Sequence, residues 1–204
     1  LITLLIVNDG SGDNTGEIIR QLLDQIKEPN QLKMVSHSIN KGYGAALRTG
    51  IRFAIENNYD YALFMDSDLT DHPSYIKIFY EKMLQDWDYI KTTRFSKGGG
   101  YIGVHWKRRL IAFCGNIFAR VITGLPLTDI ANGFRAVKVD ILKQLDLTEN
   151  NFSIIVEEIM KARKITNSFC EIPRMQGVRG QGARASKFTY DFITIWKYMK
   201  YLFL

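Results

Sequence analysis

The sequence predicts an α/β protein built on a mostly parallel sheet with helices on both faces. Three observations carry this prediction. Short apolar runs rich in β-branched residues alternate at least three times with stretches of helical apolar spacing. The apolar runs are nearly continuous, as in strands buried on both faces. The 204 residues, 46% hydrophobic and 24% charged, suffice for one domain with a hydrophobic core and exclude a disordered chain.

The first half of the chain supplies the alternating units. Residues 1–7 are apolar and end in a turn of Asn, Asp, Gly and Ser, which predicts a buried strand. A helix follows, because Asn14 and Glu17 have the spacing of a capping box and apolar residues then recur at helical spacing until Pro29. The next expected elements are a strand at 32–36, a helix whose apolar face includes 46–55, a strand at 61–65, a helix from about Pro73 to Leu84 and a strand near 89–93.

The pattern changes after Arg94. Three glycines at 98–100 predict a flexible loop, and residues 129–138 mix polar side chains with a glycine. Helices are expected from His105 to about Ile122, over 152–164 and from 189 to the end, with a strand at 168–172. We expect one domain over residues 1–204. Its aromatic segment 189–204 either packs on the domain or lies at a membrane interface.

Acidic residues follow two of the predicted strands. Asp66 and Asp68 are separated by one residue at a strand end, where parallel sheets bind ligands. Mg²⁺ and Mn²⁺ prefer such oxygen ligands and share them with substrate phosphates, although a polar loop that caps the next helix is the simpler alternative. Asp9 could accept hydrogen bonds from a base or ribose, or belong to a plain turn.

Charge and composition narrow the partners. The 27 Lys and Arg against 21 Asp and Glu give a net charge of +6, which suits phosphate, a lipid headgroup or nucleic acid. The basic residues are dispersed and form no nucleic-acid reader motif, so we expect no nucleic acid. Two cysteines exclude a disulfide framework and favour a reducing compartment. The three histidines are scattered, and none is assigned a catalytic role. The arginines beside glycine-rich segments suit phosphate best: Arg94, Arg135, Arg179 and Arg184.

Several segments carry a family resemblance that covers nearly the whole chain. They are residues 7–11 (VNDGS), 40–46 (NKGYGAA), 65–69 (MDSDL), 94–95 with the following glycines, 132–136 (NGFRA), Glu157 and 186–187. In this order and spacing they resemble the inverting glycosyltransferases of GT-A fold, glycosyltransferase family 2. Within that family they are similar to the branch of dolichol-phosphate mannose synthases and polyprenyl-phosphate glycosyltransferases.

The resemblance implies a donor site for a nucleotide diphosphate sugar. In it Asp9 holds the nucleotide, and Asp66 and Asp68 bring in Mg²⁺ or Mn²⁺ with the diphosphate. Arg179 and Lys187 would close over the donor from a mobile loop. This loop is about two residues longer than in the family, so Arg184 competes with Arg179 for one role.

The resemblance also implies a polyprenyl phosphate acceptor. Arg94 and Arg109 would receive its phosphate, Arg135 would assist, and together with Asp68 they form the expected catalytic set. A lipid phosphate is already an anion, so it can attack the anomeric carbon with inversion and without a base. Such an enzyme would work at the cytoplasmic face of a membrane, either peripherally or anchored by segments outside this chain.

Two other functions stay open. A related transferase acting on a saccharide hydroxyl needs a base, for which Glu157 or Glu158 is the candidate. A non-catalytic nucleotide-binding module is the second, favoured by Asn8 where the family usually has Asp and by Phe113 where some relatives have a phosphate-binding Ser. The chain opens directly in a strand without an initiator Met, and in the family a further strand precedes it. We expect roughly 10 to 40 residues upstream, without which the sheet has a gap or an exposed edge.

Overall fold

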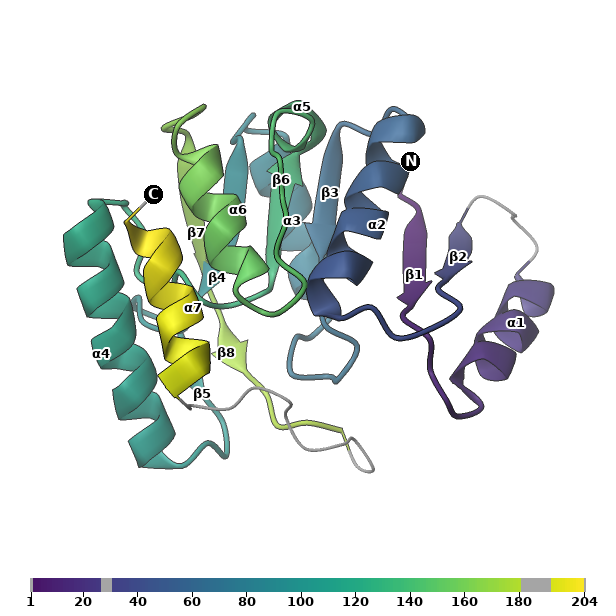
Figure 1. Cartoon of the computed structure of the whole chain (residues 1–204), viewed down its shortest axis with the longest axis horizontal. Coiled ribbons are helices and arrows are strands. Elements are labelled where there is room, and N and C mark those ends of the chain that lie inside the picture. Colours follow the sequence, from purple (N-terminus) through teal and green to yellow (C-terminus); the bar gives the residue numbers. More distant parts are fainter. Residues whose placement is uncertain (1, 27–30, 181–191, 204) are drawn as a thin grey trace.

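The computed structural model describes residues 2–26, 31–180 and 192–203 (Figure 1). In chain order its elements are β1 (Leu4–Asn8), α1 (Thr15–Gln25), β2 (Leu32–Ser36), α2 (Tyr43–Glu56), β3 (Tyr61–Phe64), α3 (Tyr75–Met83), β4 (Tyr89–Thr93), β5 (Gly100–Tyr101), α4 (Trp106–Thr123), β6 (Arg135–Lys138), α5 (Val139–Leu142), α6 (Ile154–Ala162), β7 (Phe169–Pro173), β8 (Met175–Gln176) and α7 (Phe192–Leu202).

A four-stranded sheet in the order β3-β6-β4-β7 forms the centre of the molecule. β4 is parallel to β7, whereas β6 is antiparallel to both of its neighbours. β1 with β2, and the short β5 with β8, form separate parallel pairs. Most strand pairings of the described residues are thus parallel, as predicted, but β6 is a strand where the sequence indicated none.

Helices cover both faces of this sheet, which confirms the predicted fold class. α2 packs on β1 and β3, whereas α3 contacts β4 and β7 from the opposite face (Figure 1). The alternation along β4 explains the two layers. Tyr89 joins the core under α6 and α7, and its neighbour Ile90 joins Phe79 and Phe134 under α3. All five residues of β4 are buried, as expected of a strand covered on both sides.

The start of α1 differs from its prediction. No hydrogen bond from the Asn14 side chain caps the helix, so the capping box with Glu17 is not formed. The backbone of Asn14 (φ −69°, ψ 7°) lies outside the extended region in which a capping side chain reaches the first turn. Asp13 replaces it, because its Oδ1 accepts from the N–H of Thr15 at 3.1 Å and from the Thr15 hydroxyl at 2.5 Å.

β1 and β3 are among the strands that have a neighbour on one side only over the described residues. Within the described ranges β1 pairs only with β2, and β3 pairs only with β6. The Tyr59 hydroxyl reaches the Thr3 hydroxyl at 2.7 Å, and α2 packs on both strands. An upstream strand beside β1 stays a prediction. Over the same ranges, the helices are too short or too polar to cross a membrane.

Candidate active site

Two of the predicted donor residues, Asp9 and Asp66, lie at the N-terminus of α2. The backbone N–H of Gly42 donates to Oδ2 of Asp9 at 2.8 Å. The hydroxyl of Tyr43, the next residue, donates to Oδ1 of Asp66 at 3.4 Å. The turn after β1 and the loop after β3 therefore lie on either side of one helix start. This arrangement agrees with the rule that parallel strands present their ligand sites at the carboxyl ends.

Asp9 is held by the chain itself. Its carboxylate accepts from the backbone N–H groups of Lys41 and Gly42, and Oδ1 lies 2.7 Å from Nδ1 of His37. Burial alone would raise the pKa of Asp9, but the bond to His37 and the two backbone bonds outweigh it and lower the pKa. Sequence reasoning gave the histidines no partner, and the structure places His37 on Asp9. The carboxylate thus anchors the loop that leads into α2.

This anchor predicts a pH-dependent contribution to stability. A carboxylate with a lowered pKa stabilises the fold above its ordinary pKa of 3.8 and loses this contribution as the pH falls through the folded value. Asp9→Asn should therefore lower the free energy of unfolding at pH 7 by about 2 kcal/mol. It should also flatten the acid limb of the stability curve. Urea unfolding at pH 7 and in acid measures both effects.

Asp24→Asn, on the exposed surface of α1, is the matched control and should change neither quantity. An equal loss in both variants would refute an anchoring role of Asp9.

The two carboxylates after β3 differ in environment. Burial and the charge of Asp68 raise the pKa of Asp66, so its ionised form is held at a cost. Asp68 is partly exposed, and its Oδ1 accepts from the N–H of Thr70 at 3.0 Å and from the Thr70 hydroxyl at 2.7 Å. Its Oδ2 lies 3.0 Å from Nη2 of Arg179. A cation between Asp66 and Asp68 would relieve the repulsion that raises the pKa of Asp66.

The donor set fits a hard divalent cation that is shared with a phosphate. Mg²⁺ sites commonly use one or two protein carboxylates and complete the shell with substrate oxygens and water. Over the described residues no group of three or more His, Cys, Asp or Glu side chains could hold a metal ion. Asp66 and Asp68 therefore fit an ion bound together with a diphosphate better than one bound by protein alone.

Residues 174–180 connect the loop that carries Asp66 and Asp68 to a second site. The N–H groups of Gly177 and Gly180 donate to the carbonyls of Thr70 and Asp68 at 3.0 and 3.1 Å, and Arg179 pairs with Asp68. At the start of the segment the guanidinium of Arg174 pairs with Asp71. The predicted Lys187 and its neighbour Arg184 lie outside the described residues.

The same segment reaches Arg94 through Gln176. Oε1 of Gln176 accepts from Nη1 of Arg94 at 3.0 Å, and Asp129 accepts from Nε and Nη2 of Arg94 at 2.6 and 2.7 Å. Asp129 is fully buried and is fixed in turn by Glu171, whose Oε1 accepts from the N–H groups of Thr128 and Asp129. The guanidinium of Arg94 is thus oriented by a chain of bonds that starts on β7.

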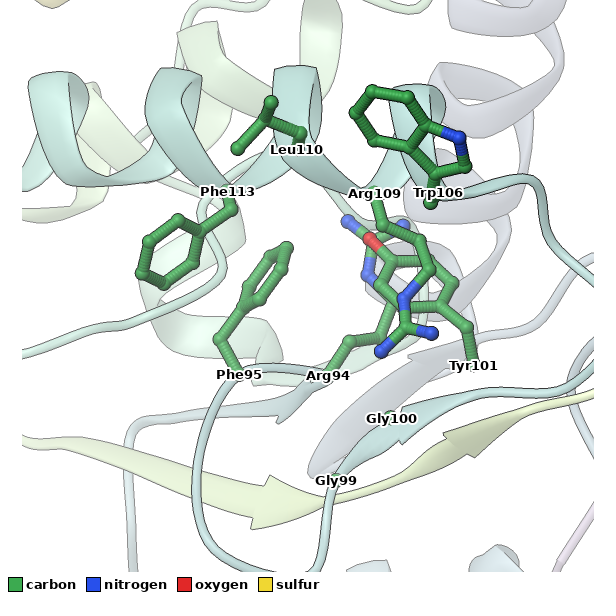
Figure 2. Close-up of a pocket in the computed structure, with 9 residues that line it drawn as sticks. All are labelled: Arg94, Phe95, Gly99, Gly100, Tyr101, Trp106, Arg109, Leu110 and Phe113. Carbon is green, nitrogen blue, oxygen red and sulfur yellow. The ribbon is translucent and has the colours of Figure 1, made fainter.

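Arg94 lines a cavity of about 540 Å³ between the glycine loop and α4. Figure 2 shows Arg94, Tyr101 and Arg109 grouped on one side of it, with Phe95 facing Phe113 on the other. The two guanidinium carbons lie 5.1 and 5.7 Å from the Tyr101 ring centroid, and the two phenyl centroids lie 5.7 Å apart. The cavity combines cations with aromatic walls, so it suits a ligand with an anionic head and an apolar body.

Arg135 occupies a different place from the one expected of an acceptor ligand. Its side chain is fully buried, donates to Glu158 and to the carbonyl of Gly133, and lies 4.4 Å over the Phe64 ring. Its charge opposes the upward shift of the Asp66 pKa. Arg135 therefore acts on the carboxylate of Asp66 from the buried side of the site, through its positive charge. Contact with a phosphate in the cavity stays a prediction.

Both candidate bases are engaged by the protein. Glu157 accepts from the backbone N–H groups of Thr148 and Glu149 and from Nζ of Lys161. Burial would raise its pKa, but these bonds prevail and lower it, which makes the carboxylate a weaker base. Glu158 accepts from Arg135 and from the Tyr89 hydroxyl. Both carboxylates are also fully buried, so neither is exposed to a saccharide hydroxyl as a general base must be.

Sequence reasoning missed three polar residues that hold the site: the buried Lys91 and Asp129 and the partly buried Glu171. Burial lowers the pKa of Lys91 to about 7, and its ammonium donates to the carbonyl of Asn132 beside Gly133. Lys91 and Glu171 are charged residues inside predicted strands, which is a signal that sequence alone could have used. Asp129 carried no such signal, because its partner Arg94 is 35 residues away.

Comparisons with known proteins agree with this geometry. The sequence model of "Glycosyl transferase family 2" matches residues 1–146. An undecaprenyl-phosphate mannosyltransferase of Micrococcus luteus is 26% identical over 173 residues, which are 83% of this chain and 70% of that protein. A polyprenol monophosphomannose synthase of Mycolicibacterium smegmatis is 25% identical over 147 residues, 72% of this chain and 55% of that protein.

Solved structures confirm the GT-A fold. The crystal structure of glucosyl-3-phosphoglycerate synthase from Mycobacterium tuberculosis with Mn²⁺, UDP and glucosyl-3-phosphoglycerate superposes with a TM-score of 0.61 at 19% identity. The match covers 90% of this chain and 62% of that one. A UDP complex of the same enzyme gives a TM-score of 0.64 and covers 98% and 67%. This chain therefore spans about three fifths to two thirds of that enzyme.

Proposed function

This chain belongs to glycosyl transferase family 2, and from that premise we propose that it moves a sugar from a nucleotide diphosphate sugar to a polyprenyl phosphate. One observation supports this proposal above the others. Segment 174–180 bonds both to the loop that carries Asp66 and Asp68 and to Arg94 in the cavity. A diphosphate site and an anion-and-apolar site therefore share one connecting segment, as donor and acceptor must when they react with each other.

The donor half of the site uses the carboxylates and the cations around them. Asp66 and Asp68 would hold a divalent ion, Mg²⁺ or Mn²⁺, which would supply positive charge to the diphosphate of the donor. Nη2 of Arg179 lies 3.0 Å from Oδ2 of Asp68, so its guanidinium would be placed to bind the diphosphate when a metal ion occupies Asp66 and Asp68. Asp9 acts on the nucleotide through the loop 40–42, which it anchors. Lys187 would bind the same diphosphate, and Arg184 remains a rival of Arg179 for one role there.

The acceptor half is the cavity beside α4. Arg109 contacts the phosphate of the lipid, Arg94 is aimed at it by Asp129 and Gln176, and the aromatic walls receive the first isoprene units. The phosphate oxygen attacks the anomeric carbon from the face opposite the leaving group. A bond from carbon to the lipid phosphate forms as the bond to the nucleoside diphosphate breaks, with inversion. No proton has to move, because the nucleophile is already an anion near neutral pH.

The engaged state of Glu157 and Glu158 favours this function over transfer to a saccharide hydroxyl, which requires a base. The direct test is incubation with phosphorylated polyprenol, a panel of nucleotide diphosphate sugars and Mg²⁺ or Mn²⁺, followed by mass spectrometry of the lipid extract. We expect a lipid-linked sugar whose formation stops when the metal is chelated. Absence of any such product across the panel contradicts the proposal.

The non-catalytic alternative has its own test. Calorimetric titration with nucleoside diphosphates and Mn²⁺ should show binding for an enzyme and for a binding module. Binding without turnover would favour the module.

Arg109 gives a sharper test of the acceptor site. Arg109→Gln removes a charged contact, so KM for the lipid phosphate should rise about tenfold to a hundredfold, which corresponds to about 1.5–3 kcal/mol. KM for the donor should stay within a factor of about two, because the two sites use different cations. Steady-state kinetics with each substrate varied in turn measures the split. Arg20→Gln, exposed on α1, is the control and should leave both KM values unchanged. A rise in the donor KM instead would move Arg109 to the donor site.

The location follows from the acceptor. We place the protein at the cytoplasmic face of a membrane, where a polyprenyl phosphate is embedded and the site can reach it. The two roles predicted for segment 189–204 stay predictions. Tyr201 and Leu202 of α7 are buried in the domain, whereas Trp196 is 63% exposed.

A further inference from the structure

Tyr43 lies between two glycines at the start of α2, and its hydroxyl reaches Asp66. The hydroxyl is the donor to Oδ1 of Asp66, at 3.4 Å, because an ionised carboxylate can only accept. Burial raises the pKa of Tyr43, so the hydroxyl keeps its proton near neutral pH. A constant hydrogen-bond donor therefore stands beside one carboxylate of the proposed metal site.

The two glycines let the loop that precedes α6 approach this helix start (Figure 1). The N–H of Gly44 donates to the carbonyl of Asn150 at 2.8 Å. A Cβ on Gly42 would lie 2.6 Å from that carbonyl oxygen, and a Cβ on Gly44 would overlap the carbonyl oxygen of Glu149. Both obstructing atoms are backbone, so a side chain at either position would push the loop away.

The close approach of the loop holds the Tyr43 ring in place. The ring centroid of Phe152, which the loop carries, lies 4.7 Å from that of Tyr43. The backbone of Gly133 is close to the hydroxyl, since a Cβ there would lie 2.9 Å from the Tyr43 oxygen and 3.7 Å from Oδ2 of Asp66. The aromatic contact and the nearby backbone restrict the movement of the hydroxyl relative to Asp66.

The loop is itself fixed by bonds from α6 and α7. Glu157 of α6 accepts from the N–H groups of Thr148 and Glu149 at 3.0 and 2.9 Å. The hydroxyl of Tyr201, on α7, donates to Oε1 of Glu149 at 2.8 Å. Glu157 therefore supports the wall of the donor site, which is a different task from that of a base.

Resting on the proposed function, we propose that Tyr43 is a positioning residue for the divalent ion: its hydroxyl fixes the orientation of the Asp66 carboxylate before the ion binds. A hydrogen-bonded partner of a metal-binding carboxylate typically contributes about 10- to 100-fold to metal affinity. Burial raises the pKa of Asp66, and the bond from Tyr43 opposes this shift and so favours the ionised form.

The test removes one oxygen atom. Tyr43→Phe keeps the ring beside Phe152 and deletes the hydroxyl, whereas Tyr59→Phe deletes a hydroxyl that donates to Thr3 at 2.7 Å, beyond the other end of α2. Calorimetric titration with UDP, GDP, ADP and CDP, with and without Mn²⁺, measures how much the ion strengthens nucleotide binding. This gain should fall about tenfold in Tyr43→Phe, whereas the affinity without Mn²⁺ should stay within a factor of about two. Tyr59→Phe, the matched control, should equal the parent in both quantities.

Transfer assays and unfolding give two further measurements. The Mn²⁺ concentration for half-maximal rate should rise about tenfold in Tyr43→Phe, with KM for the polyprenyl phosphate unchanged. Urea unfolding shows whether the two Phe variants lose similar stability. A purely structural role of the hydroxyl would lower stability without a selective loss of the Mn²⁺ effect.

Two results would overturn the positioning role and leave the proposed function intact: an unchanged gain from Mn²⁺ in Tyr43→Phe, or an equal loss of that gain in Tyr59→Phe. A loss of nucleotide affinity that is the same with and without the ion would also overturn it. If no lipid-linked sugar forms but the gain still falls in Tyr43→Phe alone, the proposed function fails and the positioning role stands. A parent protein whose nucleotide binding does not respond to Mn²⁺ contradicts both.

Discussion

Asp66→Asn is expected to lower kcat/KM for sugar transfer by about 10³-fold, equivalent to about 4 kcal/mol of transition-state stabilisation. Asn has the shape of Asp but not its charge, and an amide is a poor partner for a divalent ion beside a diphosphate. Initial rates over a range of Mn²⁺ concentrations measure the effect. Higher metal concentrations should recover little of the lost activity.

The same substitution should stabilise the fold. The raised pKa of Asp66 means that the folded state disfavours its ionised form, through burial first and the charge of Asp68 second. This cost is absent below the ordinary pKa of 3.8 and grows as the pH rises through the folded value. The free energy of unfolding of Asp66→Asn should therefore exceed that of the parent at pH 7 and match it in acid. Urea unfolding at both pH values decides this.

Asp140→Asn, on an exposed ion pair with Lys143, is the matched control and should affect neither activity nor stability measurably. A less stable Asp66→Asn protein would show that the carboxylate has a structural role, and full activity would remove it from the donor site.

Glu158→Gln is expected to lower the free energy of unfolding by about 3–5 kcal/mol, a large share of the stability of a single domain. Glu158 forms an ion pair with Arg135, and both side chains are fully buried. Burial would lower the pKa of Arg135, but the charge and hydrogen bonds of Glu158 outweigh it and raise that pKa further. Without Glu158 the guanidinium keeps its charge in the core and loses its counter-ion. Denaturant unfolding at pH 7 measures the loss.

A double-mutant cycle separates the charge from the packing. Arg135→Met/Glu158→Gln removes the orphaned charge and leaves the Gln amide oxygen to accept from the Tyr89 hydroxyl. It should therefore be more stable than Glu158→Gln alone. A Glu158→Gln protein within about 1 kcal/mol of the parent would mean that water or another group solvates Arg135. The double variant removes the charge of Arg135 near Asp66, and Glu158→Gln removes the partner that holds Arg135. Transfer activity should therefore fall in both variants.

The sequence predicted the strands and helices that are determined by residues close together in the chain. β1 and β3 are apolar runs bounded by turn residues, and α2 has helical apolar spacing, so each forms where it was expected. The carboxylates after β1 and β3 were found by the same logic, since strand ends gather at one edge of the sheet.

The features that the sequence did not predict depend on residues that are far apart in the chain. β6 is four residues long and contains Arg135 and Lys138, which carry no strand signal. It is a strand because Arg135 meets Glu158 of α6, 23 residues later, and because β3 and β4 both offer open edges. The orientation of Arg94 likewise depends on Asp129 and Gln176, which no spacing rule connects to it.

The position of β6 has a consequence for synthesis of the chain. β6 lies between β3 and β4 but follows both in sequence, so these strands have no direct ladder with each other. When the ribosome has released β4, the space between the two strands stays empty until residues 135–138 emerge, an interval of some seconds at about 5–20 residues per second. During that interval the facing edges of β3 and β4 are unpaired in the nascent chain. Chaperone binding and aggregation would both involve these unpaired edges before residues 135–138 emerge.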